Sequence, residues 1–195
     1  MPKTGMEPLR RRELISAAIE SIHAQGMAQV TMGDIARRAG VSAGLAHHYF
    51  GGKDQLLSAT MRHLLSELGE EIQAQLASVR GPRERLSAII RGNFAPCQFR
   101  PAVVSAWLAF YVAAQTDKQA RRLLHIYRRR LESNLLHELQ KLTSRTDAAR
   151  IAETIASLID GLWIRHSLND AESDSVGAVA VVESALDDAL RRTHA

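Results

Sequence analysis

Residues 31–50, TMGDIARRAGVSAGLAHHYF, constrain the fold more than any other part of the sequence. Thr31 and Asp34 have the spacing of a capping box, in which each side chain accepts a hydrogen bond from the other residue's backbone, so a helix is predicted to begin just after Thr31. Gly40 can adopt the positive φ that ends a helix, and Ser42 is a preferred N-cap for the next one. The segment therefore predicts two short helices joined by a glycine turn, the geometry that places a second helix in the major groove of DNA.

Helical periodicity continues through the rest of the chain, with Gly, Pro and Asp at the boundaries. The helix predicted to begin near Lys53 carries an apolar stripe with steps of three and four residues: Leu57, Met61, Leu64, Leu68, Ile72 and Leu76. Other helices are predicted over residues 8–25, 83–95, 103–115, 117–142, from Thr146 or Asp147 onward, and 174–192. In the last two, the residues predicted to face the core are Ile151, Ile155, Leu158, Leu162, Val179, Val182 and Leu186. With only five prolines and almost no alternating apolar pattern, the sequence predicts an all-α fold.

Positive charge is concentrated at the N-terminal end. Residues 1–62 hold eight Lys and Arg against five Asp and Glu, a net +3 of the chain's +4. Part of this excess is a basic cluster before and at the start of the first helix, formed by Lys3, Arg10, Arg11 and Arg12. Such a cluster suits DNA phosphates or an adjacent minor groove, although on charge alone a solvated helix end explains it equally well.

Several classes of protein are excluded by what the sequence lacks. The longest nearly uncharged apolar run, residues 103–114, is far shorter than the roughly 20 residues of a membrane span, and no apolar signal segment is present, so we expect a cytoplasmic protein that does not bind membranes. The single cysteine, Cys97, excludes an intrachain disulfide and a cysteine-based zinc cluster. His47 and His48 point about 100° apart on a helix, so no metal site is expected. No catalytic motif or cofactor motif is found, which argues against an enzyme.

The chain resembles the TetR family of bacterial repressors in three features that follow one another: a basic first helix, the segment TMGDIARRAGVSAGLAHHYF and the segment GGKDQLL. Further segments, MPKTGMEPLRRRELI, HYFGGKDQLLSATMR, AWLAFY, RRRLESNL and LIDGLWIR, resemble the choline-sensing, betaine-pathway branch of that family over nearly the whole length. The resemblance implies a fold of about nine helices, with a three-helix DNA-binding domain over residues 1–52 and a ligand-binding and dimerisation domain over residues 53–195. It also implies a homodimer that represses genes for choline uptake and glycine betaine synthesis, with choline as the small-molecule effector.

Family positions that face the major groove correspond here to Ser42, Ala43, Leu45 and His47, and those that position phosphates correspond to Thr31, Tyr49 and Lys53. Many relatives have lysine in place of Ala43 and tyrosine in place of His47. Direct readout then has few strong donors, which favours contacts with thymine methyl groups or recognition of DNA shape. Arg37 and Arg38 could add phosphate contacts, or be solvated arginines on a helix face.

Aromatic residues are concentrated after residue 90, and three of them share one helix face by their spacing: Trp107, Phe110 and Tyr111. A quaternary ammonium such as choline has no N–H to donate, so proteins hold it over aromatic faces, often near a carboxylate. The resemblance therefore implies an effector site that includes these three rings with Trp163 and Asp160. Without the resemblance, ordinary core packing and a helix distortion at Asp160–Gly161 are the better explanation.

Two alternatives remain open from the sequence. One is a repressor of the same fold that responds to a different, perhaps lipophilic, ligand. The other is a dimeric helical interaction module without affinity for DNA, which salt-dependent operator binding would distinguish.

Overall fold

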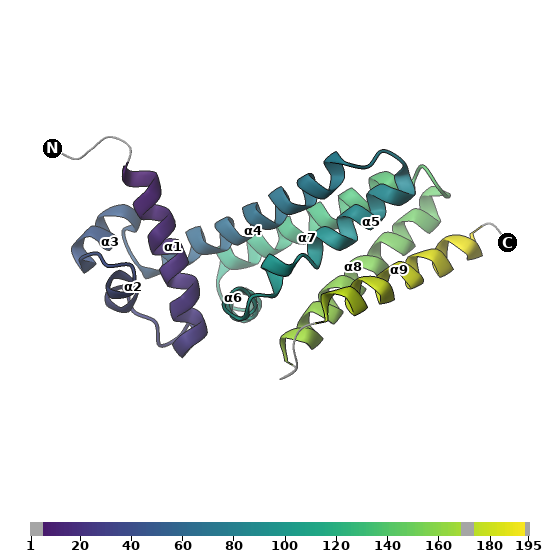
Figure 1. The fold of residues 1–195 in the computed structure, drawn as a ribbon. Coiled ribbons are helices and arrows are strands. Elements are labelled where there is room, and N and C mark those ends of the chain that lie inside the picture. Colours follow the sequence, from purple (N-terminus) through teal and green to yellow (C-terminus); the bar gives the residue numbers. More distant parts are fainter. Residues whose placement is uncertain (1–5, 169–173, 194–195) are drawn as a thin grey trace. The chain divides into compact units, whose positions relative to one another are not determined.

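The computed structural model describes residues 6–168 and 174–193. Across these ranges the chain forms nine α-helices, one short 3₁₀ turn and no strand (Figure 1), which confirms the predicted all-α fold. The elements are α1 (Met6–Gln25), α2 (Met32–Arg38), α3 (Ala43–Phe50), α4 (Lys53–Ala77), α5 (Pro82–Asn93), η1 (Pro96–Phe99), α6 (Pro101–Ala113), α7 (Lys118–Leu139), α8 (Arg145–Ser167) and α9 (Ser175–Arg192).

The helices group into two compact units, and each is described by itself. Unit 1 comprises the chain up to Leu65 together with Pro101–Leu124, and unit 2 comprises Ser66–Arg100 together with the chain from His125 onward. Helix α4 contributes its first half to unit 1 and its second half to unit 2. The predicted domain boundary after residue 52 does not coincide with the division into these two units, and it stays a prediction.

Unit 1 is built around α1, which packs against α2 and α6. Its buried face carries Leu14, Ala18 and Ile22, as the periodicity predicts. The helix ends at Gly26, whose φ of +77° is a conformation that favours glycine and lets its N–H bond to the Ile22 carbonyl at 2.8 Å. Helix α1 is therefore held in place by apolar burial and stopped by a local signal.

Unit 2 is tied together by ion pairs between helices that are distant in sequence. Arg83 of α5 donates to Glu183 of α9 at 2.6 Å and to Asp187 of α9 at 2.7 Å. Burial alone would lower the pKa of Arg83, but the hydrogen bonds to Glu183 and Asp187 outweigh it and raise that pKa. Helices α8 and α9 also pack together, burying Ile155 and Val182 among others.

Two details of unit 2 differ from the sequence expectation. Helix α8 begins at Arg145, not at Thr146 or Asp147, because the Ser144 hydroxyl accepts the Asp147 N–H at 3.2 Å and acts as the N-cap. Three of the residues expected to face the core in the last two helices are only half-buried, namely Leu158, Leu162 and Val179. The other four are buried as predicted: Ile151, Ile155, Val182 and Leu186. The buried stripe instead keeps four-residue steps throughout each helix, so that it continues to Ile159 in α8 and begins at Ala178 in α9.

We expect Glu138→Gln to destabilise the protein by about 2 kcal/mol, because Arg85 would keep its charge without a carboxylate partner. Glu138 is 2 % exposed and accepts from Arg85 and Lys141 at 2.7 and 2.6 Å. Burial alone would raise its pKa, but these two hydrogen bonds prevail and lower it. The pair therefore stabilises the fold above the ordinary glutamate pKa of 4.5, and its contribution is lost as the pH falls through the lower folded-state pKa.

Urea unfolding at pH 7 and at pH 3 measures this effect. The deficit of Glu138→Gln should shrink at the lower pH, because protonation of Glu138 in the unfolded wild type reduces the stability that the ion pair contributes. The exposed Glu132 on the same helix provides the control, and Glu132→Gln should change stability by less than about 0.5 kcal/mol. Equal effects of the two substitutions would contradict the structural role of Glu138.

Candidate DNA interface and effector-binding residues

The start of α2 is fixed by the capping box that the sequence predicts. The Thr31 hydroxyl accepts the Asp34 N–H at 3.1 Å, and the Asp34 carboxylate accepts the Thr31 N–H at 3.1 Å. The side-chain hydrogen bond from Thr31 lowers the pKa of Asp34 below its ordinary value. The carboxylate is therefore held at the positive end of α2.

The turn between α2 and α3 is a Schellman motif. Gly40 has φ of +67°, its N–H bonds to the Arg37 carbonyl at 3.2 Å, and the Val41 N–H bonds to the Ala36 carbonyl at 3.0 Å. Ser42 then caps α3 by accepting the Leu45 N–H at 3.2 Å. Both helix ends thus follow from the local signals in residues 31–50.

The predicted groove-facing residues lie on the outer face of α3. Ser42, Ala43 and His47 are exposed and Leu45 is half-buried, whereas the opposite face of the helix is buried. The His47 Nδ1 lies 3.1 Å from the Gly51 carbonyl, which can only accept, so Nδ1 carries the hydrogen. This leaves Nε2 as the ring nitrogen available to a base edge, and in the tautomer that carries its hydrogen on Nδ1 it accepts, which suits the amino groups of cytosine or adenine.

Arg11 has an intramolecular role that the sequence analysis missed. Its guanidinium donates to the Tyr49 carbonyl at 2.7 Å and lies 4.8 Å from the centre of the Phe50 ring, while Glu7 pairs with it at 3.3 Å. Arg11 and Tyr49 are 38 residues apart, so no local pattern could have indicated this contact. Arg11 therefore connects α1 to the end of the predicted recognition helix.

The remaining residues of the basic cluster differ in their surroundings. Arg10 pairs with Glu13 at 2.7 Å within α1, and Arg12 is exposed. Lys3 lies outside the described residues. Of the cluster, Arg12 is thus the described member with the most accessible charge.

Other predicted phosphate contacts also lie at the surface of unit 1. Arg37 is exposed, with its guanidinium 3.1 Å from Asp34, and Arg38 beside it is exposed as well. The Lys53 ammonium donates to the Ala28 carbonyl at 3.3 Å. To contact a phosphate, Arg37 and Lys53 must give up or share these intramolecular contacts, which are weak because they are exposed to water.

Removing the cap of α2 should have a measurable cost. We expect Thr31→Ala to lower the free energy of unfolding by about 1 kcal/mol, because the Asp34 N–H loses its acceptor. Thr31→Ser keeps the hydroxyl and should retain most of the stability. Urea unfolding followed by circular dichroism measures the difference, and equal losses in both variants would show that the capping hydrogen bond contributes little.

The predicted effector residues fall into the two units. In unit 1, helix α6 carries Trp107 and Phe110, which are buried, and Tyr111, which is half-buried. The rings of Trp107 and Tyr111 lie 6.5 Å apart, as expected for residues on one helix face. In unit 2, Asp160 and Trp163 lie on α8, which stays helical through Gly161.

Unit 2 places additional aromatic rings around Trp163. Phe99 of η1 lies 6.4 Å from Trp163 and 5.9 Å from His166, centroid to centroid. The Tyr127 hydroxyl of α7 donates to Asp160 at 3.0 Å. These neighbours were not predicted from the sequence, although the three-residue step from Trp163 to His166 indicates that those two residues share a helix face. Together they form an aromatic cluster beside a carboxylate.

No described helix is long and apolar enough to cross a bilayer. Among the residues that the structure describes, no group of three or more His, Cys, Asp or Glu side chains is arranged to hold a metal ion.

Two models of known protein families match the chain, one in its N-terminal part and one in its C-terminal part. The family model for bacterial regulatory proteins of the tetR family matches residues 14–60, and the model for the C-terminal region of BetI-type transcriptional repressors matches residues 82–191. The chain is 56% identical over 183 residues to the HTH-type transcriptional regulator BetI of Brucella anthropi, covering 94% of each protein. It is 56% identical over 191 residues to the protein of the same name from Agrobacterium fabrum, covering 98% of this chain and 93% of that one.

Solved structures agree on the fold. A transcriptional regulator from Pseudomonas aeruginosa PAO1 matches with a TM-score of 0.82 and 26% identity, covering 95% of this chain and 94% of that one. A transcriptional regulator from Saccharomonospora viridis, solved in complex with choline, matches with a TM-score of 0.75 and 22% identity, covering 94% of this chain and 96% of that one. Because one family model spans more than half of the sequence and the relatives match along almost all of it, the chain belongs to the TetR family and is a transcriptional repressor of the BetI type.

Proposed function

We propose that this repressor controls genes for choline uptake and glycine betaine synthesis, and that choline is the effector that weakens its binding to operator DNA. The observation that carries the proposal is the 56% identity, over 94% of both chains, to a regulator named BetI. The choline bound by the Saccharomonospora viridis protein of the same fold supports the choice of effector. The protein acts in the cytoplasm, together with the DNA it binds.

In this proposal, a homodimer presents two copies of α3 to successive major grooves, about 34–36 Å apart. The base-facing residues are Ser42, Ala43, Leu45 and His47, all of which are at least partly accessible on α3. Phosphates are contacted by Thr31, Tyr49 and Lys53, with additional charge from Arg37 and the arginines of the first helix, Arg10, Arg11 and Arg12. Arg11 also holds the end of α3 through the Tyr49 carbonyl.

The effector contacts follow from the chemistry of a quaternary ammonium, which is attracted to aromatic faces and carboxylates. In unit 2 we assign this role to Trp163, which is half-buried beside Phe99, and to Asp160. In unit 1 the proposed contacts are Trp107, Phe110 and Tyr111, of which Tyr111 is the most accessible. Choline must bind more tightly to a conformation that cannot dock both recognition helices, and typical coupling of this kind is about 1–3 kcal/mol.

Removing the Trp163 ring tests the effector assignment. We expect Trp163→Ala to raise about tenfold the choline concentration that releases half of the operator DNA, because a partly desolvated cation–π contact contributes about 1–2 kcal/mol. Trp163→Phe keeps an aromatic face and should lose less. Fluorescence anisotropy with labelled operator measures both variants, and an unchanged choline response in Trp163→Ala would remove this residue from the site.

Footprinting on the DNA upstream of the protein's own gene, with and without choline, tests the function. Protection of a paired site that recedes with choline, and that an apolar cation of similar size releases less well, is the expected result. Protection released only by a lipophilic cation would favour a TetR-family repressor with a different ligand. Absence of any protected site would overturn the proposal.

A further inference from the structure

One of the side chains proposed to face the bases of DNA can change the hydrogen bond that it offers. Of Ser42, Ala43, Leu45 and His47, two are apolar, and the Ser42 hydroxyl already accepts the Leu45 N–H at 3.2 Å. His47 is exposed in the last turn of α3, and it is the only one of the four that titrates near neutral pH. Polar readout by this face of α3 therefore depends mainly on the His47 ring.

Two hydrogen bonds join His47 to Gly51 and set the direction of the ring. The Gly51 N–H donates to the His47 carbonyl at 2.7 Å, and the His47 Nδ1 lies 3.1 Å from the Gly51 carbonyl. Gly51 ends α3 with φ of +80°, a conformation that favours glycine. Because a carbonyl only accepts, Nδ1 keeps its hydrogen, and the proton that His47 gains or loses is the one on Nε2.

The major groove distinguishes the two states of Nε2. Without its proton Nε2 accepts, which matches the amino donor of cytosine, whereas with its proton Nε2 donates, which matches the N7 and O6 acceptors of guanine. In this groove cytosine offers only the donor and guanine only acceptors, so each base suits one state of the ring. An imidazole changes its charge between about pH 5 and pH 8. The preferred base therefore depends on the protonation of His47.

The helices around His47 do not fix its charge. Within the described part of the chain no carboxylate pairs with His47, and α3 itself contains no acidic residue. The other titratable groups of α3 are His48 and Tyr49. On α2, which packs against α3, the Asp34 carboxylate pairs with Arg37 at 3.1 Å, and Arg38 is exposed.

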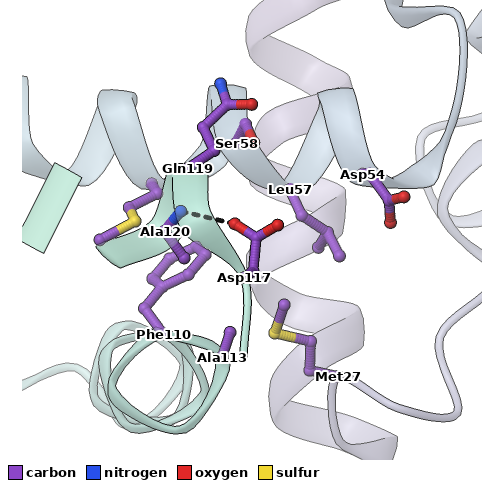
Figure 2. Close-up of a pocket in the computed structure, with 10 residues that line it drawn as sticks. Met27, Asp54, Leu57, Ser58, Phe110, Ala113, Asp117, Gln119 and Ala120 are labelled. Atoms are coloured by element: carbon purple, nitrogen blue, oxygen red, sulfur yellow. Dashed lines mark hydrogen bonds between the residues drawn. The ribbon is translucent and has the colours of Figure 1, made fainter. Parts of the chain in front are cut away.

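The charged groups of α1 and α4 nearest to α3 also have other partners. Arg11 of α1 pairs with Glu7 at 3.3 Å, and Lys53 donates to a backbone carbonyl of the α1–α2 turn at 3.3 Å. Asp54 lies in the first turn of α4 and lines a pocket formed with the residue after α1 and the α6–α7 turn (Figure 2). The base that His47 meets can therefore select either state of the ring.

We infer that His47 makes the base preference of the repressor depend on pH, with cytosine preferred near pH 8 and guanine near pH 5.5 at the position that it contacts. This role rests on the proposed function, because it requires α3 to lie in the major groove. Each half-site of a palindromic operator meets one His47, so a base change made in both half-sites counts twice. The affinity of the guanine operator relative to the cytosine operator should rise at least about tenfold from pH 8 to pH 5.5.

Selection of binding sites from a randomised DNA library, at both pH values and with the full-length protein, tests this inference. The position that His47 reads is the one whose base preference is lost in His47→Ala, and operators with cytosine or guanine there are then compared by competition. Their affinity ratio cancels the general gain in DNA binding that any protonated surface histidine gives. His47→Gln keeps a donor and an acceptor but does not titrate, so its ratio should change less than about twofold. The matched control is His48→Gln, at the exposed neighbouring position, which should keep the wild-type response.

NMR of the protein labelled with ¹⁵N-histidine provides the second measurement, with His47→Gln assigning the signals. At pH 8 the neutral ring of His47 should carry its hydrogen on Nδ1. A hydrogen on Nε2, no operator position that depends on His47, or a base ratio that does not change with pH would each overturn the inference. If operators are selected but their base preference is the same at both pH values, the proposed function stands and only the role of His47 fails. If no sequence is selected, the proposed function fails as well.

Discussion

Ala43→Glu is expected to weaken operator binding by at least about 100-fold while leaving the fold intact. Ala43 is exposed at the first position of α3, where the proposed dimer brings one copy into the major groove of each half-site. A carboxylate there repels DNA, and a loss of about 1.5 kcal/mol in each subunit amounts to about 3 kcal/mol for the dimer, which exceeds 100-fold in Kd. The same carboxylate is favourable at the positive end of a helix, so stability should not fall.

Two matched substitutions separate charge from size at this position. Ala43→Gln has nearly the same shape as the glutamate variant and should weaken binding far less, whereas Ala43→Lys should strengthen binding to all sequences and steepen its salt dependence. Fluorescence anisotropy at several salt concentrations measures all three variants. Equal affinities for the glutamate and lysine variants would show that α3 does not approach DNA at this residue.

Gly92→Ala is expected to destabilise the protein by about 3 kcal/mol, because the added methyl group has no space. A Cβ at Gly92 would lie 2.8 Å from Cγ1, 3.0 Å from Cα and 3.3 Å from the backbone nitrogen of Ile72 on α4. A side chain could rotate away, but helix backbone cannot move without separating α5 from α4. The added methyl group therefore disrupts the packing of α5 against α4 within unit 2.

Gly69→Ala is the matched control for this substitution. Gly69 lies inside α4, and a Cβ there meets nothing within 4 Å in the described chain, so alanine should stabilise the helix by about 0.5–1 kcal/mol. Thermal and urea unfolding of the two variants should thus shift in opposite directions. Similar shifts in the same direction would contradict the close approach of α5 to α4.

Local signals in the sequence predicted much of the fold. The capping box of Thr31 and Asp34, the Ser42 cap and the positive φ of Gly40 are all confirmed, because each depends on residues within four positions of one another. The buried stripe of α4 from Leu57 to Leu76 is also confirmed, since it needs only helical periodicity.

Contacts between distant segments were beyond sequence reasoning. The Arg11 contact with the Tyr49 carbonyl joins residues 38 positions apart, and the Arg83 pairs with α9 join residues 100 or more apart. A single sequence specifies which face of a helix is apolar but not which partner covers it, so charged side chains cannot be matched across helices. For the same reason Tyr127 was not linked to Asp160. The predicted DNA-contacting and effector-contacting residues stay predictions.

The most direct test of the account is whether operator and choline affect each other's binding equally. Measuring the operator Kd with and without saturating choline, and the choline Kd with and without saturating operator, gives two ratios that thermodynamic linkage requires to agree. We predict that each ligand weakens the other by the same factor, about 5-fold to 150-fold. An operator Kd that choline leaves unchanged would contradict the account.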